Sequence, residues 1–92
     1  EARARKRAEA ESRNAKNRDR RVIEKEVQRL EKEIQKAEAQ ITELTAELEN
    51  PETYENPARA VAINRDLTTA QTTLDCLTPE WEKAAGKLEA FE

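Results

Sequence analysis

An apolar residue recurs at every third or fourth position between Ile23 and Leu48, and this run constrains the fold more than any other feature. The spacing alternates between four and three residues without a break. A period of 3.5 residues places one narrow apolar seam along a helix, as in a coiled coil, so the helix needs a single partner. The first seam consists of Ile23, Val27, Leu30, Ile34, Ala37, Ile41, Leu44 and Leu48.

A second run with the same rhythm supplies a partner for the first seam. The second seam consists of Ala60, Ile63, Leu67, Ala70, Leu74, Leu77, Trp81, Ala84, Leu88 and Phe91. If the chain folds back between the two runs, facing residue numbers sum to 107 or 108. Leu48 then lies opposite Ala60, and Ile23 lies opposite Ala84. This match favours a hairpin within one chain, which we expect to be monomeric.

The segment 50–57 between the two seams has the composition of a tight turn. It contains two Asn-Pro steps, Asn50-Pro51 and Asn56-Pro57, six residues apart. Pro51 disfavours helix in the residue before it. Asn56 can cap the next helix, and Pro57 suits its first position. A connection this short turns the second helix back antiparallel to the first.

The predicted fold is therefore all-α, an antiparallel two-helix coiled-coil hairpin with a basic N-terminal helical extension. The hairpin spans 22–92, with a first helix at 22–49, a turn at 50–57 and a second helix at 58–91. The remaining residues, 1–21, form a basic arm, either a helical extension or a linker to other parts of a longer protein. A disordered tail is the alternative for the arm.

Two features of the second seam qualify this prediction. Pro79 removes a helical hydrogen bond, and Thr78 is a candidate cap for a fresh helix. Because the heptad phase continues past Pro79, we expect a kink near 75–79 and no separate helix. At the far end, Leu88 and Phe91 fall opposite Arg20 and Lys16. The stems of these cations can cover apolar surface, although Phe91 can equally contact a missing domain or a second chain.

Composition excludes several classes of function. The chain has no His, one Gly and one Cys, which leaves no catalytic triad, no His-based metal site and no phosphate-binding glycine loop. We expect neither an enzyme nor a metal site here. No apolar run approaches the ~20 residues needed to span a bilayer, and no signal peptide is apparent. The lone Cys76 favours the reducing cytosol. The absence of Met suggests a piece of a longer protein.

The charges are divided unevenly along the chain, although the net charge is only -3. The basic arm holds nine Lys/Arg against four acids, a net of +5, whereas 22–92 carry a net of -8. Such an arm often binds a polyanion. The candidate nucleic-acid-binding residues are Arg3, Arg5, Lys6, Arg7, Arg13, Lys16, Arg18, Arg20 and Arg21.

On a helix, four of these cations share one face and form a stripe that can follow a phosphate backbone. Lys6, Arg13 and Arg20 recur at seven-residue intervals, and Lys16 joins them. No aromatic residue is interleaved with them, so base stacking is not indicated. Arg59 and Arg65 near the turn are secondary candidates. The alternative is an ordinary solvated charged helix.

Three stretches resemble the C-terminal coiled-coil domain of ABC-F ATPases, in particular the Uup type. The run KRAEAESRNAKNR (6–18) resembles the basic, Asn-containing segment before that domain. LENPETY (48–54) resembles the Leu-x-Asp/Asn-Pro-x-x-Tyr hairpin turn of the family. Trp81-Glu82 resembles the Trp-Glu pair near the end of its second helix. Thr78-Pro79 departs from the family, which usually has a helical run before the Trp.

The resemblance implies an accessory domain of a cytoplasmic ABC-F protein with two ATP-binding cassettes and no membrane domain. The parent protein would be an ATPase that uses ATP and magnesium, with no cofactor held by this segment. Its partners would be DNA or ribosomal RNA, through the basic arm, and the ATP-binding domains of the same chain. Two alternatives stay open: the tRNA-contacting C-terminal coiled coil of valyl-tRNA synthetases, and a purely structural or dimerising coiled coil.

Overall fold

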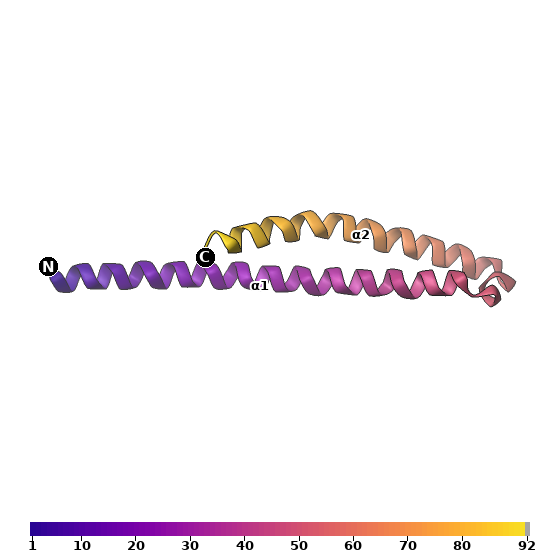
Figure 1. The fold of residues 1–92 in the computed structure, drawn as a ribbon, viewed down its shortest axis with the longest axis horizontal. Helices are drawn as coiled ribbons and strands as arrows, with labels where there is room; N and C mark the ends of the chain where they lie inside the picture. Colours follow the sequence, from indigo (N-terminus) through magenta and orange to yellow (C-terminus); the bar gives the residue numbers. More distant parts are fainter. Residues whose placement is uncertain (92) are drawn as a thin grey trace.

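The computed structural model describes residues 1–91 as two long helices joined by one turn of 3-10 helix. Helix α1 spans Ala2–Glu49, η1 spans Pro51–Glu55 and α2 spans Pro57–Glu89. Helix α2 runs antiparallel beside the C-terminal part of α1, and the N-terminal part of α1 extends past the end of α2 (Figure 1). The molecule is a rod of 80 × 17 × 16 Å. The predicted all-α hairpin with a helical extension is confirmed.

The core is a single layer of side chains between the two helices. All six of its buried residues belong to the two predicted seams, with Leu30 and Ile63 only 1% exposed. Most other seam residues are half-buried, because one partner helix covers only one side of each seam. The fully buried set is Val27, Leu30, Ala37, Ile63, Ala70 and Ala84. At ~25 cal/mol per Å² of apolar surface, this layer is the main stabilising term for the hairpin.

Trp81 packs into the core, as its position in the second seam predicts. It packs against the buried cluster of Val27, Leu30 and Ala84. Its indole Nε1 donates a hydrogen bond to Glu31 Oε1 at 3.2 Å. The ring is therefore half-buried, with its polar edge directed to a carboxylate at the surface of α1.

The turn satisfies the last carbonyl groups of α1 with side chains. Thr53 Oγ1 donates to the Glu47 carbonyl at 2.5 Å, and the Tyr54 hydroxyl donates to the Leu48 carbonyl at 2.6 Å. Tyr54 thus folds back to Leu48, but it stays 57% exposed. Asn50 Oδ1 accepts from the Glu52 amide at 3.0 Å. Asn56 precedes α2 without a capping hydrogen bond from its side chain, contrary to the expected cap.

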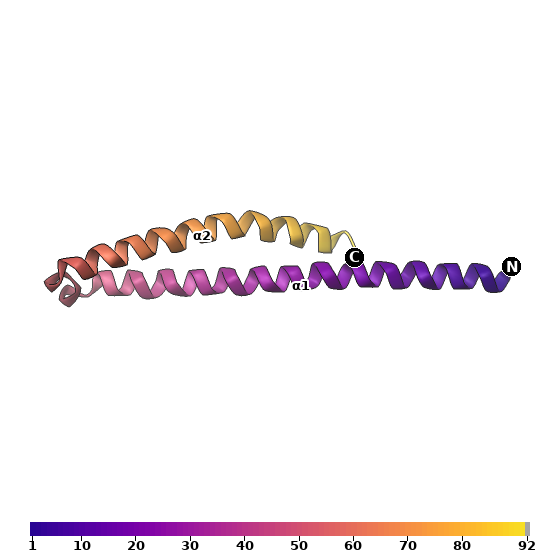
Figure 2. The same cartoon turned by 180° about the vertical axis from the view of Figure 1, so that it is seen from behind.

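Helix α2 passes through Pro79 as one helix. Thr78 does not begin a new helix, because its Oγ1 donates back to the Leu74 carbonyl at 2.9 Å. This bond lies one turn before Pro79, where the missing proline amide weakens the helical ladder. Figures 1 and 2 show α2 bowed along its length. A local kink at 75–79 stays a prediction.

Candidate nucleic-acid interface

The basic arm is helical in this structure, as the first 20 residues of α1. Ala, Arg, Lys and Glu dominate it, and these residues have high helix propensity. Because the arm continues a helix that packing already holds, it needs no nucleus of its own. All nine candidate cations are exposed on it. The N-terminal part of the arm lies beyond the end of α2, where Figure 2 shows α1 alone.

The cationic stripe is the direct continuation of the first seam. Stepping back from Ile23 by three and four residues in turn leads to Arg20, Lys16, Arg13, then Glu9 and Lys6. The face of α1 that packs on α2 therefore changes from apolar to cationic where α2 ends. A ligand bound to this face would lie along α1 in line with α2, on the same side of α1.

Most of these cations are not engaged by carboxylates. Among residues 1–91, Arg20 is the one arm cation in an ion pair, with its Nη2 3.8 Å from Glu24 Oε1. Both side chains of that pair are more than 40% exposed, so the pair is weak. The other arm cations can approach a phosphate without breaking an ion pair to the described part of the protein.

Arginines of the hairpin, unlike most cations of the arm, form short ion pairs with glutamates. Arg29 Nη2 lies 2.6 Å from Glu26 Oε1, and Arg29 Nη1 lies 3.1 Å from Glu33 Oε1. The hydrogen bond from Arg29 lowers the pKa of Glu26 below its ordinary value. Arg59, a secondary candidate, pairs with Glu47 at 2.6 Å across the turn. That contact gives Arg59 a structural role at the turn.

The end of α2 brings an aromatic ring to the arm. Phe91 lines a hollow of about 240 Å³ together with Arg13, Lys16, Asn17 and Arg20 of α1. The heptad count predicted Phe91 opposite Arg20 and Lys16, and the structure confirms this. Sequence reasoning did not count Phe91 among the candidate binding residues, because the arm itself contains no aromatic residue. Leu88, one turn earlier, packs against the buried cluster of Val27, Leu30 and Ala84.

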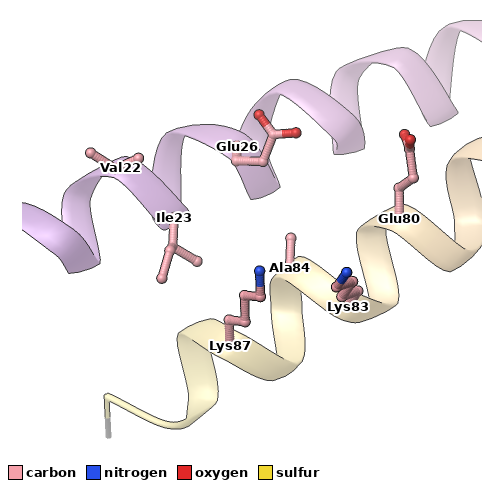
Figure 3. Close-up of a pocket in the computed structure, with 7 residues that line it drawn as sticks. All are labelled: Val22, Ile23, Glu26, Glu80, Lys83, Ala84 and Lys87. Carbon is pink, nitrogen blue, oxygen red and sulfur yellow. The ribbon is translucent and has the colours of Figure 1, made fainter.

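A groove of about 440 Å³ lies beside the junction of arm and hairpin. In Figure 3, Ile23 of α1 points toward α2 and Ala84 of α2 points toward α1. Two carboxylates and two ammonium groups surround this apolar floor. Its lining residues are Val22, Ile23, Glu26, Glu80, Lys83, Ala84 and Lys87. In the described part of the chain, no group of three or more His, Cys, Asp or Glu residues is arranged to hold a metal ion.

Comparison with known proteins identifies the family of the hairpin. The ABC transporter C-terminal domain family matches residues 21–85, which include the turn and most of both paired helices. The chain belongs to this family and is an accessory domain of an ABC-family protein. No curated protein and no solved structure matches the chain. The match begins at the last arm residue, so the family assignment rests on the hairpin.

Neither α1 nor α2, within residues 1–91, has an apolar stretch long enough to cross a membrane.

Proposed function

We propose that this chain is a nucleic-acid-binding accessory domain of an ABC-F ATPase and that the basic arm contacts the phosphates. The observation that carries the proposal is the cationic stripe, whose exposed side chains continue the line of the first seam toward the N-terminus of α1. Lys6, Arg13 and Lys16 have no ion-pair partner within residues 1–91, and Arg20 has only a weak one.

The geometry of the arm matches a phosphate backbone. Lys6 and Arg20 are 14 residues apart, which is ~21 Å along a helix that rises 1.5 Å per residue. One strand of duplex DNA has a phosphate every ~3.4 Å of helix axis, so the stripe extends past about six of them. The hairpin, with its net charge of -8, repels a polyanion. The two parts together direct nucleic acid to the arm.

The parent protein completes the proposal. Its ATP-binding cassettes, in the same chain, would use ATP and magnesium and would lie in the cytoplasm without a membrane domain. The hairpin contributes no catalytic group. The arm would connect it to the cassettes and would hold DNA or ribosomal RNA. We expect the isolated 92-residue chain to be a monomer, because the apolar residues of each seam pack against the other seam of the same chain.

The test is fluorescence anisotropy with a labelled 20-base-pair DNA duplex and a structured RNA over a salt series. The variant replaces Lys6, Arg13, Lys16 and Arg20 with Gln. The matched control replaces four exposed hairpin cations, Lys25, Lys32, Lys36 and Lys83, with Gln. Both variants change the net charge by the same amount, so only position differs.

For duplex DNA, we expect the log–log salt slope of the unmodified chain to be about -4 to -6, at roughly -0.9 per neutralised phosphate. The arm variant should lose about three to four units of slope, and the control should keep its slope. The ratio of affinities for DNA and RNA identifies the preferred polymer. If both variants lose affinity equally, the arm has no special role. If no chain binds at low salt, the domain is a mechanical coiled coil and the arm is a linker.

A further inference from the structure

Phe91 lies where the apolar core ends and the cationic stripe begins. Its side chain is 39% exposed. Three cations and one amide of α1 share a hollow with it: Arg13, Lys16, Arg20 and Asn17. The hairpin fold brings these groups together, since Phe91 is 71 residues from Arg20 in the chain.

The apolar core does not need Phe91 to close it. Leu88, one turn earlier on α2, already packs against the end of the core cluster. Phe91 therefore extends past the core and presents an aromatic ring among cations. Sites for single-stranded nucleic acid use this combination: cations hold the backbone and an aromatic face stacks on a base.

We propose that Phe91, with Arg13, Lys16, Asn17 and Arg20, binds an unpaired nucleotide at the end of the hairpin. The base stacks on the Phe91 ring, and the three cations hold the phosphates on either side of it. This inference rests on the proposed function and deepens it: the arm binds backbone in general, and the Phe91 site selects a strand whose bases are free. A fully paired duplex offers no free base face within its length.

The hollow lies at the surface, because all five residues that line it are exposed. Its volume of about 240 Å³ is below the ~300–1,000 Å³ of sites that enclose a whole small ligand, so a base would lie against the Phe91 ring without being enclosed. The weak pair of Arg20 with Glu24, at 3.8 Å, leaves Arg13 and Lys16 as cations without an ion-pair partner within residues 1–91. Asn17 adds a neutral donor and acceptor beside the three cations.

The experiment compares a blunt duplex with the same duplex carrying a four-nucleotide overhang, in DNA and in RNA versions. One overhang base is 2-aminopurine, whose fluorescence reports stacking. The variants of the 92-residue chain are Phe91→Ala, Phe91→Leu and Phe91→Tyr. Val61→Ala, at an exposed apolar position far from the arm, is the control. Circular dichroism establishes that each variant keeps its helix content.

We expect Phe91→Ala to weaken binding to the overhang by about 5- to 100-fold, the loss of stacking on one base, and to abolish the 2-aminopurine signal. Affinity for the blunt duplex should change less than twofold. Phe91→Tyr should keep tight overhang binding, because it retains an aromatic face, and Phe91→Leu should not. The DNA and RNA overhangs show which backbone the site prefers.

Two outcomes overturn the inference while the proposed function stands. In the first, Phe91→Ala binds both probes as the unmodified chain does. In the second, Phe91→Leu restores overhang binding in full, so the side chain only fills space. Failure of the unmodified chain to bind either probe at low salt would overturn the proposed function itself.

Discussion

The arm and the paired part of α1 form one helix with one heptad phase, but only the paired part packs against α2. From Ile23 to Leu48 the seam positions are apolar, and α2 covers them. From Lys6 to Arg20 the same positions are mostly cationic and exposed, and Phe91 borders Arg13, Lys16 and Arg20 without burying them. Both parts are α-helical and follow the same heptad period. The difference teaches that residue type at the seam positions decides where a helix acquires a protein partner and where it stays available to a charged ligand.

The two parts also differ in what keeps them helical. The paired part of α1 gains the burial of Val27, Leu30 and Ala37 against α2. The arm has only its own propensity and its connection to a folded helix, whereas most helical stability in proteins comes from packing of an apolar face. We therefore expect the arm to open locally, whereas the hairpin unfolds as one unit.

The largest expected effect is on stability when the core is truncated. Leu30→Ala removes a side chain that is 1% exposed and should lower the free energy of unfolding by about 2–5 kcal/mol. Lys16→Ala, on the same face of the same helix, should change it by less than about 0.5 kcal/mol. Urea unfolding followed by circular dichroism measures both. A similar loss for the two variants would mean that the arm belongs to the cooperative unit.

A matched pair of glycine variants sharpens the comparison. Ala39 and Ala8 are both exposed on α1, one beside α2 and one in the arm. Ala39→Gly should lower the free energy of unfolding of the hairpin by about 0.5–1 kcal/mol. Ala8→Gly should leave that free energy unchanged and should speed amide exchange in the arm alone. Hydrogen exchange measured residue by residue separates these outcomes, and protection spread evenly over α1 would contradict the division.

The smallest expected effect concerns a single carboxyl group of the hairpin. Arg29 lowers the pKa of Glu26 through a hydrogen bond, so Arg29→Gln should return that pKa to its ordinary range. Because the folded pKa is lowered, this contact adds stability above the ordinary pKa of Glu26. That stability is lost as the pH falls through the lowered value.

An NMR titration of the Glu26 side chain measures this shift, with Arg13→Gln in the arm as the control that leaves Glu26 unchanged. An unchanged Glu26 pKa in Arg29→Gln would show that Arg29 does not form this hydrogen bond in solution.

Local sequence was sufficient for the fold class. The two seams, the Asn-Pro steps and the continuous heptad phase across Pro79 predicted the antiparallel hairpin, because coiled-coil pairing depends on a period that can be read residue by residue. The charge asymmetry identified the nine arm cations in the same way. The helical state of the arm stayed open, since propensity alone does not decide between a helix and a disordered tail.

Only the tertiary structure decided the particular side-chain hydrogen bonds of the turn and of the paired helices. Asn50 caps η1, the Tyr54 hydroxyl reaches the Leu48 carbonyl, and Trp81 donates to Glu31. These bonds depend on side-chain directions that the heptad period leaves undetermined. At Phe91 the heptad period already predicts the neighbours Lys16 and Arg20, and the fold adds Arg13 and Asn17 to the same hollow. Sequence thus determined which helices pair and where the charge lies, and the fold determined which groups meet at the end of the pair.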